Sequence, residues 1–225
     1  MNSFVVTVAR GFGSGGKEIA SRLAQRLGVH CYENRILTLA SQLSGLDENR
    51  FLDINEKLRT SGAISGLLAG LPRLRRSDPR DEAFVSDDRL FEYQKEIILH
   101  LADTESCVIV GKCADFILKD HANVVSVYIE APRRYCYKRI MQKMGVDEST
   151  AHRSIDSTDR YRAAYYKYYT GGNYWTNPVN YDITLNSERL GIEGCVEMIL
   201  HCLRVKFPGQ AAFERPSIPS NPKEA

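Results

Sequence analysis

The stretch GFGSGGKE, residues 11–18, decides the fold expected of this chain. It fits a phosphate-binding loop, in which a glycine, four variable residues, a second glycine and a lysine precede Ser or Thr, except at the last position. Glycines let backbone N–H groups turn inward around an anion, and the helix that follows directs its positive end to the same place. Lys17 would then reach the terminal phosphates of a nucleotide. The alternative, a glycine-rich corner without a ligand, accounts less well for four glycines followed by a lysine.

The flanks of this loop have the patterns of a strand and of a helix. Residues 4–9 are rich in β-branched and apolar side chains, which predicts a buried strand. Ile19, Leu23 and Leu27 recur every four residues and share one helical face, and Gly28 suits a helix end. The loop therefore lies between a strand and a helix, where phosphate binding requires it.

Glu18 occupies the position at which the loop pattern has a hydroxyl that helps to hold magnesium. A carboxylate beside phosphates would repel them, so the Glu18 side chain is expected to turn away from the phosphates. Because Mg²⁺ keeps several waters and binds largely through substrate phosphates, losing one hydroxyl need not abolish the site. Ser14 could supply a hydroxyl from within the loop. The alternative is a nucleotide binder with weak or no catalysis.

The bulk properties of the chain are those of an ordinary α/β domain. Its 225 residues suffice for one domain with a sizeable core, and its 43% hydrophobic and 26% charged content is typical. A net charge of +2 gives no case for a nucleic-acid polymer as a partner. No apolar run approaches the roughly 20 residues of a membrane span, and the chain begins with a strand rather than a signal-peptide pattern. We therefore expect a cytoplasmic protein without a membrane partner.

The six cysteines include no C-x-x-C pair. Neither a zinc site nor a dithiol redox motif is supported, and we expect the cysteines to serve as small core residues.

Strand-like and helix-like segments alternate along the chain. Strands are predicted at residues 4–9, 30–33, 107–111, 124–131 and 181–186. Helices are predicted at residues 17–28, 34–44, 88–103, 132–144, 147–169 and 191–206. The alternation predicts a three-layer α/β fold in which helices flank a five-stranded parallel sheet, with ligands at the carboxyl ends of the strands.

Two regions interrupt this rhythm. Residues 45–86 combine a Gly- and Leu-rich segment with several arginines and predict a helical insert or flap. Those arginines could meet phosphates, although a solvated charged loop is the simpler interpretation. The tail, residues 207–225, is rich in proline and poor in apolar side chains, so we expect it to be disordered.

Residues 150–175 gather arginines and carboxylates. Arginine forks stabilise the charge that develops on a transferring phosphoryl group, and a closing lid could carry them while excluding water. The alternative is a solvated amphipathic helix with internal ion pairs. Elsewhere, Lys112 follows a predicted strand and would lie at the carboxyl edge of the sheet, where it could hold the phosphate of a second substrate. Asp115 could accept a hydrogen bond there, although a surface lysine at a strand end is also common.

Taken together, these segments resemble the cytidylate kinase-like family of bacterial P-loop proteins, which are relatives of the nucleoside monophosphate kinases. The matching stretches run in the family's order and cover residues 11–37, 107–118, 127–140, 157–171 and 181–200. In this family a basic residue and Glu usually follow the Gly-Ser-Gly-Gly stretch, so Glu18 is a family trait.

The resemblance implies a P-loop kinase domain over residues 1–206, with an acceptor-binding insert at 45–86 and a lid at about 150–175. It implies transfer of the γ-phosphoryl group of ATP, with Mg²⁺, to a nucleoside monophosphate such as CMP or dCMP. By resemblance, ATP would be bound by Gly11, Gly13, Ser14, Gly15, Gly16, Lys17, Glu18 and Asn186. The catalytic residues would be Lys17, Arg153, Arg160, Arg162 and Asp159. The acceptor would be bound by Tyr32, Glu33, Arg35, Lys112 and Asp115, with Lys112 replacing the arginine of the family's Gly-Arg-x-x-Asp stretch.

Two other functions stay open at this point. One is a P-loop kinase for a different small acceptor, since related folds phosphorylate other small molecules. The other is a nucleotide-binding regulatory protein without catalysis, which Glu18 and Lys112 motivate. No side chain is assigned to the metal, which would be held mainly by ATP phosphates and water with Ser14 as a possible ligand, and a homodimer is compatible with the tyrosines and the basic insert.

Overall fold

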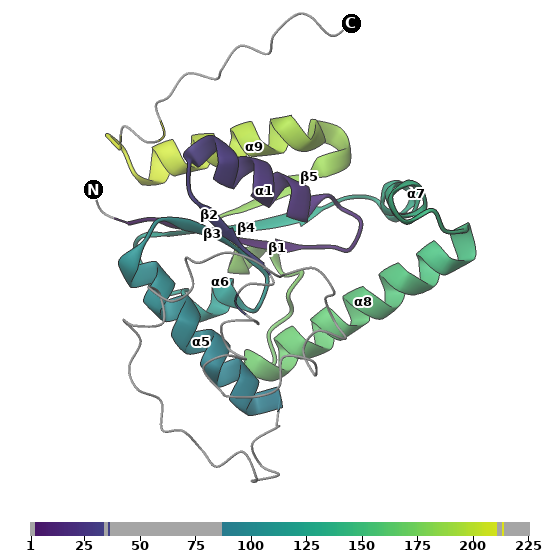
Figure 1. The fold of residues 1–225 in the computed structure, drawn as a ribbon, viewed down its shortest axis with the longest axis horizontal. Coiled ribbons are helices and arrows are strands. Elements are labelled where there is room, and N and C mark those ends of the chain that lie inside the picture. Colours follow the sequence, from purple (N-terminus) through teal and green to yellow (C-terminus); the bar gives the residue numbers. More distant parts are fainter. Residues whose placement is uncertain (1–2, 34–35, 37–86, 211–212, 214–225) are drawn as a thin grey trace, which may run out of the picture.

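A five-stranded parallel sheet forms the centre of the computed structural model, which describes residues 3–33, 36, 87–210 and 213 (Figure 1). Its strands are β1 (Val5–Arg10), β2 (His30–Tyr32), β3 (Cys107–Val110), β4 (Val124–Glu130) and β5 (Ile183–Asn186). They lie in the order β2-β3-β1-β4-β5, so β1, which leads into the glycine-rich loop, is paired on both sides. The predicted five-stranded parallel α/β fold is confirmed.

Helices cover both faces of this sheet. One face carries α1 (Gly16–Leu27) and α9 (Ser187–Lys206), and the other carries α5 (Asp87–Thr104) and the short α6 (Ala114–Ile117) (Figure 1). Beyond the carboxyl ends of the strands lie α7 (Arg133–Met144) and α8 (Glu148–Tyr169). The end of α8 returns to α5, where the Tyr169 and Phe91 rings stack with centroids 3.9 Å apart.

The central strand β1 is buried on both faces because its side chains alternate between two cores. Val6 and Val8 pack into the core formed with α1 and α9, whereas Val5 packs into the core formed with α5. A near-continuous apolar run is what a parallel strand covered on both faces requires. This burial anchors the residues that immediately follow β1, and these residues form the loop.

Local signals explain where several helices begin and end. Gly28 ends α1 with φ 68°, and Asp147 precedes α8 and accepts a hydrogen bond from the Thr150 N–H at 2.8 Å. The last helix starts at Ser187 rather than at the predicted residue 191, because Asn186 caps it and Gly191, at φ 69°, marks a kink. The short helix α6 was not predicted.

Several predictions fall outside the described residues: the insert at 45–86, Arg35, nearly all of the helix at 34–44 and most of the tail. Within the tail, Phe213 departs from the expected disorder, because it is 2% exposed and packs edge-on against Phe4 at a centroid distance of 4.8 Å. An aromatic ring that reaches an apolar site is ordered even in a polar segment.

The six cysteines are free thiols, and four of them, Cys107, Cys113, Cys136 and Cys195, are buried. Among the helices described, none combines the length and apolar character needed to cross a membrane.

Candidate functional site

The glycine-rich loop connects the carboxyl end of β1 to the first turn of α1. Gly13 and Gly15 both have φ 85°, a left-handed conformation that side chains other than glycine rarely adopt. A Cβ at Gly13 would also lie 2.9 Å from the Cβ of Cys136 on α7, and one at Gly16 would lie 2.5 Å from the Cβ of Arg10. The loop therefore needs its glycines both for its backbone conformation and for close packing.

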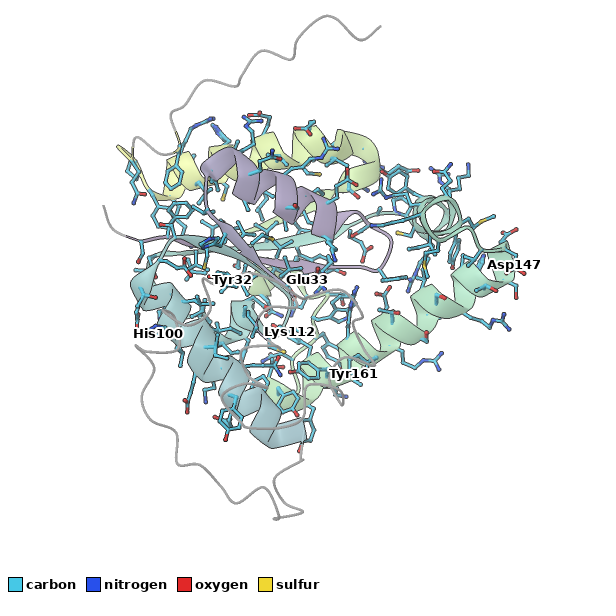
Figure 2. All side chains as sticks on the ribbon, viewed as in Figure 1. Tyr32, Glu33, His100, Lys112, Asp147 and Tyr161 are labelled. Carbon is cyan, nitrogen blue, oxygen red and sulfur yellow. The ribbon has the colours of Figure 1, made fainter. Side chains whose placement is uncertain are left out.

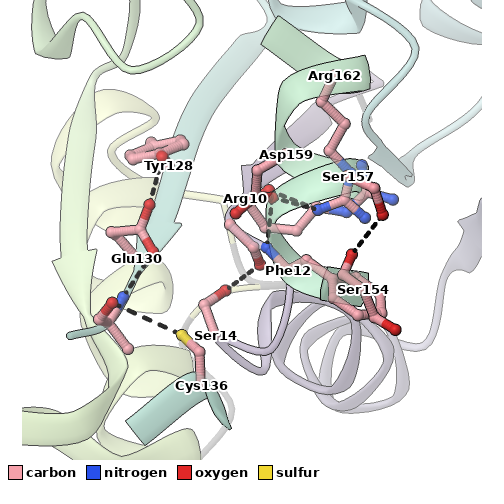
Figure 3. A network of polar contacts seen from close by, with 12 residues as sticks. Arg10, Phe12, Ser14, Tyr128, Glu130, Cys136, Ser154, Ser157, Asp159 and Arg162 are labelled. Atoms are coloured by element: carbon pink, nitrogen blue, oxygen red, sulfur yellow. Dashed lines mark hydrogen bonds and ion pairs between the residues drawn. The ribbon is translucent and has the colours of Figure 1, made fainter. Parts of the chain in front are cut away.

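Ser14 fastens the loop from inside. Its hydroxyl is fully buried and donates to the Gly11 carbonyl at 2.8 Å (Figure 3), and the Ser187 hydroxyl at the start of α9 donates to the Ser14 carbonyl at 2.5 Å. In this structure the Ser14 hydroxyl is turned into the interior of the loop, where it is bonded to the Gly11 carbonyl. The suggestion that Ser14 helps to hold Mg²⁺ stays a prediction.

The Glu18 carboxylate lies between two guanidinium groups. It accepts from Arg22 on α1 at 2.8 Å and from Arg139 on α7 at 3.0 Å. Although partial burial alone would raise the Glu18 pKa, the hydrogen bonds from Arg139 and Arg22 lower it below its ordinary value. The carboxylate that replaces the usual hydroxyl is therefore neutralised by arginines and ties α1 to α7.

A cavity of about 280 Å³ opens at the loop. Its charged lining comes from five parts of the fold and comprises Arg10, Lys17, Glu18, Glu33, Arg139, Lys143 and Arg162. The Lys17 ammonium, whose side chain is 62% exposed, contacts the Glu33 carboxylate at 2.5 Å, and Glu33 also lies 3.6 Å from Arg10. The cavity thus combines inward-facing glycine backbone with an excess of cations, which suits an anionic ligand.

Asp159 connects α8 to the loop (Figure 3). The backbone N–H of Phe12 donates to Asp159 Oδ1 at 2.8 Å, and Arg133 on α7 donates to Oδ2 at 2.8 Å. Arg162, one turn further along α8, lies 3.5 Å from Asp159, donates to the Arg10 carbonyl at 3.0 Å and places its guanidinium 5.5 Å from the centre of the Phe12 ring. A carboxylate and an arginine of the predicted lid therefore meet the loop.

The predicted lid residues divide into two groups. Asp159 is buried and Arg162 half-buried at the loop, whereas Arg153 and Arg160 are exposed. Arg153 donates to the Thr150 hydroxyl of its own helix at 3.2 Å. In this structure the first two residues are in contact with the loop and the second two face solvent.

The predicted acceptor residues also divide. Glu33 and Lys112 lie near one another at the carboxyl edge of the sheet (Figure 2). Tyr32 is 4% exposed and donates to Glu105 at 2.5 Å, which places its hydroxyl beside β3 rather than at the loop. Asp115 is 6% exposed and accepts from the Tyr166 hydroxyl at 2.7 Å, and burial raises the pKa of Asp115 to about 6.

The side chain of Asn186, predicted to approach the ATP base, caps α9 by accepting from the backbone N–H groups of Glu188 and Arg189. Three charged residues of the cavity escaped the sequence reasoning: Arg10, Arg139 and Lys143. Arg10 had a signal, since it ends an apolar strand and immediately precedes the loop. The two helical cations on α7 had none, because a cation on an amphipathic helix is usually solvated.

No group of three or more His, Cys, Asp or Glu side chains that could hold a metal occurs among the described residues. The donor set at the loop instead fits phosphate oxygens, since it consists of glycine backbone and cations.

Comparisons with known proteins agree with this geometry. The model of the cytidylate kinase-like family matches residues 5–189. A solved structure of an uncharacterized protein from Eubacterium ventriosum ATCC 27560 is 24% identical and superposes with a TM-score of 0.66, covering 89% of this chain and 98% of that one. Shikimate kinase from Bacteroides thetaiotaomicron superposes with a TM-score of 0.50 at 12% identity, covering 89% of this chain and 98% of that one.

Shikimate kinase from Acinetobacter baumannii, solved in complex with shikimate, also gives a TM-score of 0.50, at 10% identity, covering 92% of this chain and 96% of that one. Comparison with curated proteins gives no significant match. At these sequence identities the solved structures establish the fold alone, which is that of the P-loop kinases. The match to the family model shows to which family the chain belongs. The chain therefore belongs to the cytidylate kinase-like family.

Proposed function

We propose that this chain transfers the γ-phosphoryl group of ATP to a nucleoside monophosphate, with CMP or dCMP as the first acceptors to test, giving the diphosphate and ADP. The observation that carries the proposal is the loop cavity. There Lys17 from α1 and Arg162 from α8 meet a glycine loop to which Asp159 ties the lid helix. Membership of the family supports the kinase part of the proposal, and the acceptor is the part to be tested.

The loop side of the cavity would hold the donor. Backbone N–H groups around Gly13 and Gly15 would surround the phosphates, and Lys17 would exchange its contact with Glu33 for a phosphate oxygen. Mg²⁺, when bound with ATP, would neutralise phosphate charge. Because the Ser14 hydroxyl is turned inward and Glu18 is held by two arginines, the ligands of Mg²⁺ would be phosphate oxygens and water.

Transfer itself would rest on position and charge rather than on a covalent intermediate. Arg162 is close enough to the loop to stabilise charge on the transferring group, and Asp159 orients it. Arg153 and Arg160 would contribute only if α8 moved closer to the cavity, which is how a lid excludes water.

A carboxylate could position the acceptor by accepting a hydrogen bond from one of its sugar hydroxyls, and Glu33 suits this role better than Asp115. Glu33 lines the same cavity as Lys17. Asp115 is buried beneath Tyr166, and its raised pKa reflects an environment that disfavours the charged form. We therefore assign acceptor orientation to Glu33.

The test is ADP production from ATP and Mg²⁺ with CMP, dCMP, UMP, AMP, GMP, shikimate or no acceptor. Lys17→Ala should lower the rate by orders of magnitude. Lys119→Ala is the matched control, because this exposed lysine lies between α6 and β4, away from the carboxyl ends of the strands, and contacts the Phe116 ring. Its rate should equal that of the unmodified chain.

ADP formation that depends on CMP or dCMP and is lost in Lys17→Ala supports the proposal. Turnover that depends on another acceptor instead identifies a P-loop kinase of different specificity. Silence with every acceptor, together with clear ATP binding, contradicts the proposal and favours a nucleotide-binding protein without catalysis.

A further inference from the structure

A second cavity, of about 400 Å³, opens beside α6. Its lining includes Val124 and Ser126 at the start of β4 and Asp182 just before β5, so it lies near the amino ends of these strands. The loop instead follows the carboxyl end of β1, which runs parallel to β4. Among the described residues, the linings of the two cavities have no member in common. The second cavity is therefore a separate place on the molecule, and its volume suits a small organic molecule.

Three buried side chains on this lining carry polar atoms. Asp115 comes from α6, Tyr166 from α8 and Tyr181 from the segment before β5, and they are 6%, 6% and 8% exposed. The Tyr166 hydroxyl donates to Asp115 Oδ2 at 2.7 Å, and the Tyr181 hydroxyl donates to the Trp175 carbonyl. Both phenol protons are therefore engaged, whereas both phenol oxygens keep lone pairs that can accept a hydrogen bond.

No cation accompanies the Asp115 carboxylate. It accepts hydrogen bonds from Tyr166 and from the backbone N–H groups of Asp115 and Phe116, which favour its charged form, but burial outweighs them and raises its pKa to about 6. Within the part of the chain that the structure describes, no Lys, Arg or His side chain forms an ion pair with it. A buried carboxylate in this situation is stabilised when a cation comes within reach.

The other charges near the cavity are already neutralised or solvated. Lys206 donates to both Asp182 oxygens, at 2.9 and 3.0 Å. The Lys119 ammonium lies 5.0 Å from the centre of the Phe116 ring on an exposed side chain, so solvent screens its charge. Asp115 is therefore the buried charge on this lining that lacks a counter-charge among the described residues.

A ring nitrogen on the same lining has no hydrogen bond. Nδ1 of His121 is a buried atom without a partner within the described residues. With the ring proton on Nε2, this nitrogen accepts a hydrogen bond from a ligand N–H. A buried polar atom without a partner is unfavourable unless a bound molecule satisfies it. Both His121 and Asp115 therefore suit a ligand that donates hydrogen bonds.

We propose that this cavity binds a small organic amine whose ammonium group pairs with Asp115 beside the rings of Tyr166 and Tyr181. An ammonium has three donors and no acceptor, which matches a carboxylate, two phenol oxygens and an imidazole nitrogen. Tyrosine rings also attract a cation. A phosphate or carboxylate ligand would be repelled by Asp115, so the two cavities of this chain differ in the charge of the molecule that they suit.

Tyr166 connects this site to the loop cavity through α8. Arg162, one turn earlier on the same helix, lines the loop cavity, whereas Tyr166 lines the second one. A bound amine would therefore contact the helix that also reaches the glycine loop. The inference does not depend on the proposed function, since it rests on the second cavity alone.

The test is a ligand-observed NMR titration of the full chain with benzylamine and with benzyl alcohol. The two probes differ in that an ammonium replaces a hydroxyl. At about pH 8 a carboxyl with a pKa of about 6 is charged, and so is the ammonium. We expect benzylamine to bind with a Kd in the millimolar range, and benzyl alcohol to bind about tenfold more weakly or worse, because a charged hydrogen bond is lost.

Asp115→Asn keeps an oxygen that can accept from Tyr166 but removes the charge, so the benzylamine Kd should rise about tenfold or more. Asp120→Asn is the matched control, because Asp120 is an exposed carboxylate in the turn after α6 and does not line the cavity. The melting temperature shows whether each variant is folded. A measurement on the unmodified chain needs no variant: benzylamine should shift the ring resonances of His121, identified with His121→Gln, and leave the other histidines unchanged.

Three results would overturn the inference: no binding of benzylamine, equal binding of the two probes, or the same benzylamine Kd in Asp115→Asn and Asp120→Asn. Benzylamine binding without a shift at His121 would also overturn it, because the cation would then lie elsewhere, for example at Glu33. Amine binding that requires Asp115 in a chain that phosphorylates no acceptor leaves this site standing and removes the proposed function. Phosphorylation of CMP by a chain that binds no amine does the reverse.

Discussion

Two substitutions of Asp159 should distinguish the stability contributed by its ion pairs from that contributed by its hydrogen bond with the Phe12 N–H. Asp159→Asn keeps an oxygen that can accept from the Phe12 N–H at 2.8 Å but loses the ion pairs with Arg133 and Arg162. The Arg133 side chain is 52% exposed, so solvent screens its pair, and we expect the two pairs together to contribute about 1 kcal/mol. Asp159→Ala also leaves the partly buried Phe12 N–H without its acceptor, which adds about 2 kcal/mol.

For a chain of this length, each kcal/mol corresponds to a shift of about 2–4 °C in Tm. We therefore expect Tm to fall by about 3 °C in Asp159→Asn and by about 9 °C in Asp159→Ala, measured by circular dichroism and compared with urea denaturation. Asp156→Asn, an exposed position on the same helix, is the control and should leave Tm unchanged. Equal losses in the two Asp159 variants, or losses no larger than in the control, would refute this account of the contact.

Three further predictions follow from single side chains. Glu33→Gln should lower kcat about a hundredfold or more, because the carboxylate that orients the acceptor is lost. The ADP Kd should tighten at most a few fold, because the Lys17 side chain released from Glu33 was already partly exposed. An unchanged kcat in steady-state assays would exclude Glu33 from acceptor orientation. Ser14→Ala should cost about 1 kcal/mol in urea denaturation but leave the Mg²⁺ concentration for half-maximal activity unchanged, and a several-fold rise would restore Ser14 as a metal ligand. Burial raises the Asp115 pKa to about 6, so the folded chain binds more protons than the unfolded chain between about pH 4 and pH 6. The free energy of unfolding therefore falls as pH rises through that window, by at most roughly 1.4 kcal/mol per pH unit. Asp115→Asn should abolish this contribution in urea denaturation from about pH 4 to about pH 7.5, and an unaltered slope would show that the Asp115 carboxyl titrates normally.

Much of the fold was predictable because its signals are local. These signals are the apolar run before the loop, the recurrence of Ile19, Leu23 and Leu27 every four residues, and Gly28 at the helix end. Each of them acts within a few residues. Strand and helix periodicity also located the other sheet strands to within a few residues. The kink at Gly191 and the short helix α6 were missed, since a single glycine or a four-residue turn produces no periodic pattern.

The site was predictable only in part, because its parts meet through long-range contacts. Lys17 and the glycines belong to the motif itself, and the structure places them between a strand and a helix, as the motif predicts. Nothing in the local pattern distinguishes Arg162, which meets the loop, from Arg160, which faces solvent, although both lie in the same charged segment. Their difference arises from the direction of each side chain on α8, and therefore from how that helix packs.

The sequence by itself determined that this chain forms a parallel α/β sheet with a phosphate-binding loop after its first strand, because backbone conformation and burial there follow from neighbouring residues. The tertiary structure alone decided what surrounds the loop. The Asp159 contact joins residues 147 positions apart, and the Arg10 guanidinium lies against Gly111 only because β1 and β3 are adjacent in the sheet. Strand order and helix packing are set by the whole core, so the charges that they bring together cannot be read from any one segment.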